Sequence, residues 1–140
     1  MQIEVAASGA DQLGECPLWD ERQRVLWWVD SRAPAAKRLD AANGRVTVLP
    51  LAETVGSIAF RERGGMLAAT RTGLHFLDSQ TGGLERVAAP EAQLPDNRFN
   101  DGRCDRAGRF WAGTMHLGPQ RSATGSLWCL HTDLRIEKKF

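Results

Sequence analysis

The chain repeats one pattern of strands and turns three times, and this repetition restricts the folds that it can adopt. Three stretches each contain a strand end, a polar turn and a second strand that opens with two apolar residues: LWDERQRVLWWVD (18–30), IAFRERGGMLAAT (58–70) and GRCDRAGRFWAGT (102–114). The two apolar residues recur at intervals of 40 and then 44 positions, at Leu26-Trp27, Met66-Leu67 and Phe110-Trp111. The repetition predicts three equivalent β-hairpins.

A second hairpin pattern follows each copy. Its first strand ends near Leu39, Leu77 and Leu130, and polar turn residues separate it from the next strand. Two hairpins in a unit of roughly 40–45 residues are typical of a four-stranded blade of a β-propeller. No segment of about a dozen residues keeps the period of an amphipathic helix. The sequence therefore predicts an all-β fold, a partial β-propeller of about three four-stranded blades, in a single domain over residues 1–140.

A β-sandwich is the alternative fold, because sandwiches also contain short strands with turns every roughly 8–12 residues. The common order and internal spacing of the three units favour the propeller. Propellers typically close with about 4–8 blades, so three blades leave sheet faces and edges exposed. The final stretch, LRIEKKF (134–140), lies inside a predicted strand. We therefore expect a fragment of a longer polypeptide, or a chain that associates with its missing half or with another copy.

The charge pattern does not favour nucleic acid or a membrane as a partner. Eighteen basic and 17 acidic residues leave a net charge of +1, without a block of like charge. No apolar run approaches the roughly 18 residues of a membrane span, and the N-terminus lacks the pattern of a secretory signal. Three cysteines without metal-type spacing are expected as reduced thiols, at Cys16, Cys104 and Cys129. These features predict a cytoplasmic protein.

Polar side chains precede the first strand of the first and third repeats, in the region where a propeller binds small ligands. The first repeat places a carboxylate between a glycine and an apolar strand, in GECPLW, and the third has a polar cluster, in NRFNDG. The candidate residues are Glu15, Arg98, Asn100 and Asp101. Carboxylate and amide oxygens suit a hard divalent cation, which needs donors from several blades.

The repeat spacing predicts that these candidates face the same channel mouth. Glu15 lies 11 residues before Leu26, and Phe99 lies 11 residues before Phe110. The middle repeat has the uncharged stretch VGSI (55–58) at this position, so the polarity is specific to two repeats. The alternative is that Glu15 is a solvated loop residue and that Asn-Asp-Gly forms only a turn, since Asn and Asp readily bond to their own backbone.

Two longer stretches carry a resemblance to a known family. The first, LGECPLWDERQRVLWWVD, is similar to the G-E-(G/S/C)-P-x-W opening of the gluconolactonase/regucalcin (senescence marker protein) family of sugar lactonases. The second, NRFNDGRCDRAGRFWAGTM, resembles that family's block R-x-N-D-G-(K/R)-x-D-x-x-G-R-x-(W/F)-x-G-T-M. The resemblance runs through essentially all 140 residues and covers about the first half of a family member. It implies a six-bladed propeller that holds one divalent cation at its channel mouth.

The resemblance implies roles for three candidates. Glu15 matches the family's first metal-ligating carboxylate, and Arg98 and Asn100 match residues that bind the lactone substrate. The family's later metal ligands, an Asn and an Asp that is the proposed general base, have no counterpart here, so no catalytic residue is expected within this chain. Some members also have a substrate-contacting carboxylate shortly after Thr-Met, where this sequence has His116-Leu117. That contact is not expected here.

The implied function is the metal-dependent hydrolysis of a sugar lactone, such as gluconolactone, to the aldonic acid. The implied cofactor is one divalent cation, with Ca²⁺, Mn²⁺, Mg²⁺ and Zn²⁺ all compatible with oxygen and amide ligands. A single carboxylate, Glu15, holds such an ion weakly, so we expect the isolated chain to be inactive. The alternatives are a non-catalytic truncated propeller or binding module, and a related propeller hydrolase that acts on phosphotriesters.

Overall fold

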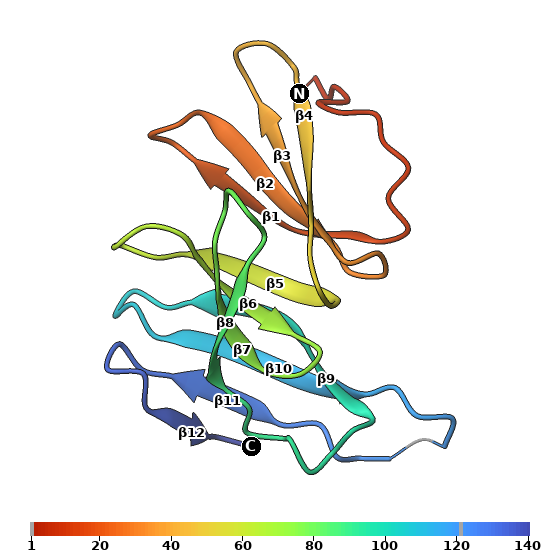
Figure 1. The fold of residues 1–140 in the computed structure, drawn as a ribbon, viewed down its shortest axis with the longest axis vertical. Helices are drawn as coiled ribbons and strands as arrows, with labels where there is room; N and C mark the ends of the chain where they lie inside the picture. The colour runs from red at the N-terminus through yellow and green to blue at the C-terminus, as the bar shows by residue number, and fades with distance from the viewer. Residues whose placement is uncertain (1, 121) are drawn as a thin grey trace.

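Three antiparallel four-stranded sheets make up the computed structural model, which describes residues 2–120 and 122–140 (Figure 1). The first sheet contains β1 (Gly14–Asp20), β2 (Val25–Asp30), β3 (Ala35–Asp40) and β4 (Val46–Pro50). The second contains β5 (Val55–Phe60), β6 (Met66–Thr70), β7 (Leu74–Leu77) and β8 (Leu84–Ala88). The third contains β9 (Asn97–Cys104), β10 (Phe110–His116), β11 (Leu127–Leu130) and β12 (Ile136–Lys138). No helix capable of crossing a membrane occurs in these two ranges.

Each sheet is one sequence repeat, which confirms the all-β prediction and the assignment of two hairpins to each unit. Within every sheet the strands pair in chain order, so that only sequential neighbours are hydrogen-bonded. The predicted strand ends at Leu77 and Leu130 coincide with the ends of β7 and β11, and Leu39 is one residue before the end of β3. Separate sheets of four strands, each formed by one repeat, are blades of a partial propeller and not the two layers of a sandwich.

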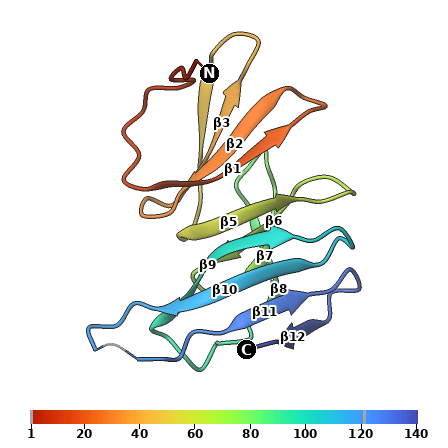
Figure 2. The ribbon, with the colours of Figure 1, turned by 180° about the vertical axis from the view of Figure 1, so that it is seen from behind.

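The first strands of the three sheets, β1, β5 and β9, lie side by side (Figure 2). The Cys16 thiol joins β1 to β5, because it accepts a hydrogen bond from the Ile58 N–H at 3.3 Å and donates to the Ile58 carbonyl at 3.4 Å. The Ser57 hydroxyl joins β5 to β9 by donating to the Asn100 carbonyl at 3.1 Å. These contacts join the three strands at the level of Cys16, Ser57 and Asn100.

Each of these inner strands contains an irregularity near its beginning. In β1, Cys16 and Pro17 stand opposite one residue of β2, and Cys16 adopts a φ of 54°. In β9, Asn100 and Asp101 stand opposite one residue of β10, and in β5 the extra residue is Gly56. A β-bulge of this kind bends the strand and redirects neighbouring side chains. The bulges occupy the same position in all three repeats, although the sequence analysis did not predict them.

Two apolar clusters hold the sheets together, one on each side of the middle sheet. Strand β6 shows why both are needed, since all five of its residues are buried. Met66 and Ala68 belong to the cluster shared with the first sheet, and Leu67 and Ala69 to the cluster shared with the third. Because successive side chains of a strand point to opposite faces, a strand between two sheets is apolar throughout.

Asp30 secures the segment that leads into β1. Its side chain is 2% exposed, and its two carboxylate oxygens accept hydrogen bonds from four backbone N–H groups, those of Gln12, Leu13, Arg32 and Ala33, at 2.8–3.2 Å. Burial raises the pKa of this carboxyl, but the four donors outweigh burial and bring the pKa below its ordinary value. The ionised form of Asp30 therefore holds the chain in place immediately before Glu15.

We expect Gly56→Ala to lower the free energy of unfolding by about 1–3 kcal/mol, the usual range for overpacking. A Cβ at position 56 lies 2.3 Å from the Asn100 carbonyl oxygen, so β5 and β9 have to separate. Urea unfolding of the purified protein measures the loss. Gly113→Ala is the matched control, because a Cβ there meets no atom within 4 Å. Equal stabilities of the two variants would contradict the close packing of the inner strands.

We also expect Asp30→Asn to cost about 1–3 kcal/mol at neutral pH, because an amide cannot accept all four N–H groups. A carboxyl whose pKa is lowered by folding stabilises the protein above its unfolded pKa of about 3.9, and this contribution disappears as the pH falls through the folded value. The difference between variant and parent in urea unfolding should therefore shrink below about pH 4. Asp133→Asn, at an exposed turn with one N–H donor, should change stability little. A difference that is independent of pH would argue against the role of the ionised carboxylate.

Candidate functional site

The predicted site residues lie within two inner strands and not before them, as the sequence analysis had placed them, because β1 and β9 begin earlier than the apolar pattern indicates. Glu15 is the second residue of β1, Arg98 is the second residue of β9, and Asn100 and Asp101 form the β9 bulge. Strand β5 lies between β1 and β9, with its uncharged residues Val55 and Gly56 at the same level. The structure thus places Glu15 and Arg98 at the same end of the adjacent inner strands, with the Asn100-Asp101 bulge next along β9.

The pKa of Arg98 is influenced by two charged side chains of the first sheet. Its side chain is half-buried, and this burial lowers the pKa of the guanidinium. The Glu15 carboxylate opposes the shift, whereas the positive charge of Arg32 adds to it. One guanidinium N–H of Arg98 donates to the Phe99 carbonyl at 3.0 Å. Glu15 and Arg98 are therefore close enough to interact electrostatically, although they come from different sheets and are separated by more than eighty positions in the sequence.

Asn100 and Asp101 differ in how much of their bonding capacity the protein already uses. The Asn100 backbone carbonyl accepts the Ser57 hydroxyl, while no hydrogen bond to the Asn100 side chain forms within residues 2–120 and 122–140. The exposed Asp101 carboxylate accepts the N–H of Gly102 at 2.8 Å, which is a local backbone contact. In the same ranges the half-buried Glu15 carboxylate makes no hydrogen bond. Glu15 and Asn100 thus keep side-chain oxygen atoms for a ligand.

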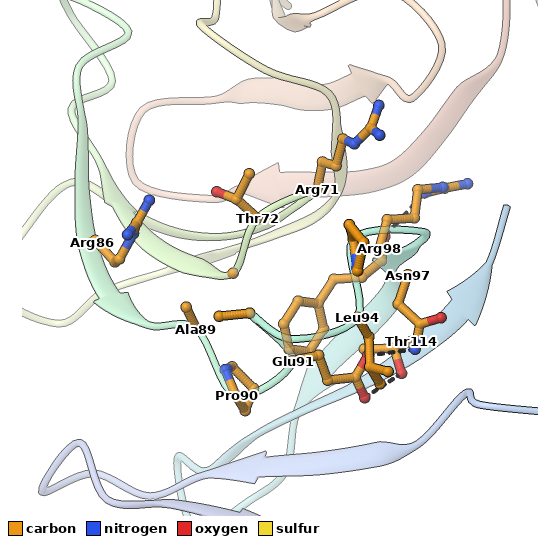
Figure 3. Close-up of a pocket in the computed structure, with 14 residues that line it drawn as sticks. Arg71, Thr72, Arg86, Ala89, Pro90, Glu91, Leu94, Asn97, Arg98 and Thr114 are labelled. Atoms are coloured by element: carbon orange, nitrogen blue, oxygen red, sulfur yellow. Dashed lines mark hydrogen bonds between the residues drawn. The ribbon is translucent and has the colours of Figure 1, made fainter. Parts of the chain in front are cut away.

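A cavity of about 200 Å³ opens beside Arg98, between the second and third sheets (Figure 3). Its walls include Arg71 and Arg86 from the second sheet and the segment 89–95 that leads into β9. Phe99 and Thr114 line it from the third sheet. This cavity was not predicted, because its two walls come from parts of the chain that no local pattern connects.

Glu91 is a structural residue of this region that sequence reasoning missed. Its carboxylate accepts hydrogen bonds from the Thr114 hydroxyl at 2.9 Å, the Trp128 indole at 2.8 Å and the Asn97 amide at 2.8 Å. Asn97 is buried and also donates to the Thr124 carbonyl at 3.1 Å. These bonds fasten the segment before β9 onto β10 and β11, and so hold Arg98 in place. A single glutamate in a polar segment carries no sequence signal for such a role.

The described residues do not complete a site for a divalent cation. Glu15 offers carboxylate oxygens, but residues 2–120 and 122–140 contain no group of three His, Cys, Asp or Glu side chains that could hold a metal ion. A calcium ion takes about 6–8 oxygen ligands, and magnesium requires about six in octahedral geometry. Glu15 fits one position of such a site and not the whole of it.

The three cysteines are free thiols. Cys16 and Cys129 are buried, and Cys104 is exposed. Burial raises the pKa of the Cys16 thiol, and its hydrogen bond from the Ile58 backbone opposes the shift. A thiol with a raised pKa is a poor nucleophile, so Cys16 serves the contact between β1 and β5.

Comparison with known proteins connects this arrangement to a family. The model of the SMP-30/Gluconolactonase/LRE-like region matches residues 13–140. A 6-deoxy-6-sulfogluconolactonase from Pseudomonas putida is 46% identical over 103 residues, which cover 74% of this chain and 35% of that protein. An L-arabinolactonase from Azospirillum brasilense is 34% identical over 98% of this chain and 46% of that protein.

A solved structure has the same fold. The regucalcin of Agrobacterium tumefaciens, described as a calcium-binding protein, superimposes with a TM-score of 0.88 and 32% identity, over 97% of this chain and 45% of that one. The chain thus spans less than half the length of each of these three proteins. Because the family model covers nearly every residue and the fold agrees, the chain belongs to the SMP-30/gluconolactonase/LRE-like family.

Proposed function

We propose that this chain forms part of an enzyme that hydrolyses a sugar lactone to the corresponding aldonic acid. The observation that carries the proposal is the placement of Glu15, Arg98 and Asn100 at one end of adjacent inner strands, with charge interaction between Glu15 and Arg98. Family membership supports the reaction class, since two of the relatives are named as lactonases of different sugars.

Arg98 and Asn100 bind the substrate in this proposal. A guanidinium offers five N–H donors, and an amide offers two donors and one acceptor oxygen, so together they match the hydroxyl and ring oxygens of a sugar lactone. Arg98 is half-buried and held by its bond to Phe99, which restricts the orientation of its remaining donors. Preorganised donors of this kind orient a substrate more effectively than freely moving side chains.

Glu15 is proposed as one ligand of a divalent cation. Its carboxylate makes no hydrogen bond within residues 2–120 and 122–140, and the regucalcin structure is that of a calcium-binding protein. Ca²⁺, Mn²⁺, Mg²⁺ and Zn²⁺ all accept carboxylate oxygen. Glu15 supplies only one of the several ligands that such an ion takes. Divalent metal dependence is therefore a property that we propose for the complete gene product.

The proposal predicts that the complete gene product releases protons from glucono-1,5-lactone and that added Mn²⁺, Ca²⁺ or Zn²⁺ increases the rate. Glu15→Gln should lower the metal-dependent kcat/KM by about 100-fold or more, because loss of even a supporting group at a metal site costs roughly 10–100-fold. Asn100→Ala should raise KM through the loss of substrate hydrogen bonds. A pH-stat assay measures both effects.

Glu62→Gln serves as the control, because Glu62 is exposed in the turn between β5 and β6, at the opposite end of the inner strands. Its activity should equal that of the parent. If the gene product shows no metal-dependent hydrolysis, or if Glu15→Gln is as active as the parent, the alternative of a non-catalytic propeller module takes the place of this proposal. Faster turnover of a phosphotriester than of any lactone would instead favour the phosphotriesterase alternative.

A further inference from the structure

We propose that a groove between the first and second sheets binds a small carboxylic acid that carries an aromatic ring. The groove measures about 710 Å³ and lies at the end of the inner strands opposite to Glu15 and Arg98. The turn between β1 and β2 and the turn between β5 and β6 border it, and both turns lie on the left in Figure 1. This second site does not depend on the proposed lactone hydrolysis.

Aromatic and apolar side chains from both sheets line the groove. Trp27 of β2 and Met66 of β6 are buried, and Phe60, at the end of β5, is 37% exposed. Phe60 stands opposite Met66 in the pairing of β5 with β6. Pockets that bind small molecules measure about 300–1,000 Å³ and are lined mainly by such side chains. The groove is therefore large enough for a whole small molecule, whose ring can pack against Trp27 and Phe60.

Arg38 brings a guanidinium without protein partners to the same groove. It stands opposite Trp27 in the pairing of β2 with β3, so the two side chains share one face of the first sheet. Over residues 2–120 and 122–140 its guanidinium makes no hydrogen bond and no ion pair within 4 Å. Its Nε is buried without a partner, which is uncommon in native proteins and calls for an explanation such as a bound ion.

The two Nη groups of Arg38 are the donors that a ligand meets. They are unbonded within the described ranges but, unlike Nε, they are not fully buried. A guanidinium can donate two parallel hydrogen bonds to the two oxygens of one carboxylate, and such charge-assisted pairs are stronger than bonds between neutral groups. A carboxylate therefore suits this position better than a single carbonyl or hydroxyl.

Trp27 supplies a further free donor beside Arg38. The indole N–H groups of Trp28, Trp111 and Trp128 each donate to a carboxylate of the protein, at 2.8–2.9 Å. The indole N–H of Trp27 makes no hydrogen bond within residues 2–120 and 122–140, and it is not fully buried. Two adjacent strands thus present unused donors and an aromatic face to one space, which matches a ligand with oxygen acceptors and a ring.

The groove as a whole is balanced in charge, so direct contact and not long-range attraction has to select the ligand. Three arginines and three acidic residues line it. One of the arginines, Arg61, lies over the Phe76 ring at 3.5 Å from its centroid. The half-buried Asp20 uses one oxygen to accept two N–H groups of its own turn, and the other two acidic residues are exposed, where solvent screens them. Arg38 is the half-buried arginine whose donors are unused.

A ¹H–¹⁵N NMR titration of the complete gene product tests the inference with phenylacetate, phenylacetamide and acetate. Phenylacetate should shift the indole N–H signal of Trp27, which Trp27→Phe identifies by its disappearance. Its Kd should be about tenfold or more below that of phenylacetamide, which lacks the charge-assisted bonds, and below that of acetate, which lacks the ring. Equal Kd values for the three probes, or no shift of the Trp27 signal, overturns the inference.

Arg38→Gln should raise the Kd of phenylacetate about tenfold or more and leave that of phenylacetamide unchanged, and Arg38→Lys should recover part of the loss. Arg45→Gln is the matched control, because Arg45 is exposed in the turn between β3 and β4 and does not line the groove. It should bind phenylacetate like the parent. An unchanged Kd in Arg38→Gln overturns the role of the guanidinium.

Urea unfolding checks that the Arg38 variants are folded. If Arg38→Gln does not fold, Phe60→Ala takes its place, since Phe60 is partly exposed at the border of the groove. This variant should weaken the binding of phenylacetate severalfold and leave that of acetate unchanged, because only the contact with the ring is lost. Phenylacetate binding that is unaltered in Phe60→Ala contradicts the proposed site.

Discussion

The close approach of the three inner strands is the contact on which the rest of the structure depends. Strands β1, β5 and β9 belong to different sheets, so no ladder of backbone hydrogen bonds joins them. They meet through small groups instead: the Cys16 thiol against Ile58, and Gly56 against the Asn100 carbonyl. Small residues allow backbones to approach, and the apolar clusters on both sides of β6 then become continuous with this contact.

The bulges in the inner strands change the direction of the side chains at the candidate site. In a regular strand, side chains alternate between two faces, whereas two residues opposite one alter the direction of those that follow. The three bulges lie at the same level of adjacent strands, at Cys16-Pro17, at Gly56 and at Asn100-Asp101. Functional side chains therefore stand beside backbone irregularities that the neighbouring strands hold in place. Asp30 and Glu91 support these strands in two ways. Asp30 accepts hydrogen bonds from Gln12 and Leu13, in the segment before β1. Glu91 lies in the segment before β9 and accepts hydrogen bonds from side chains of β9, β10 and β11.

Charged side chains from all three sheets lie at this end of the inner strands. Glu15 lies on the first sheet, Arg98 on the third, and Arg71 comes from the sheet between them. The Glu15 carboxylate counteracts the lowering of the Arg98 pKa, so opposite charges from the first and third sheets interact at this end of the inner strands.

The sequence by itself determined the all-β class, the three units and their hairpins, because turn residues and apolar alternation are local properties of the chain. Repeat spacing also predicted that Glu15 and the Arg98–Asp101 stretch lie at the same end of the fold, since equivalent positions of a repeat occupy equivalent places, and the family resemblance then singled out Arg98 and Asn100. Only the tertiary structure decided where the bulges fall, which segment Glu91 fastens and that Arg71 shares a cavity with Arg98. These features depend on which side chains from different sheets approach one another. That is a result of packing in three dimensions, and no period along the chain records it.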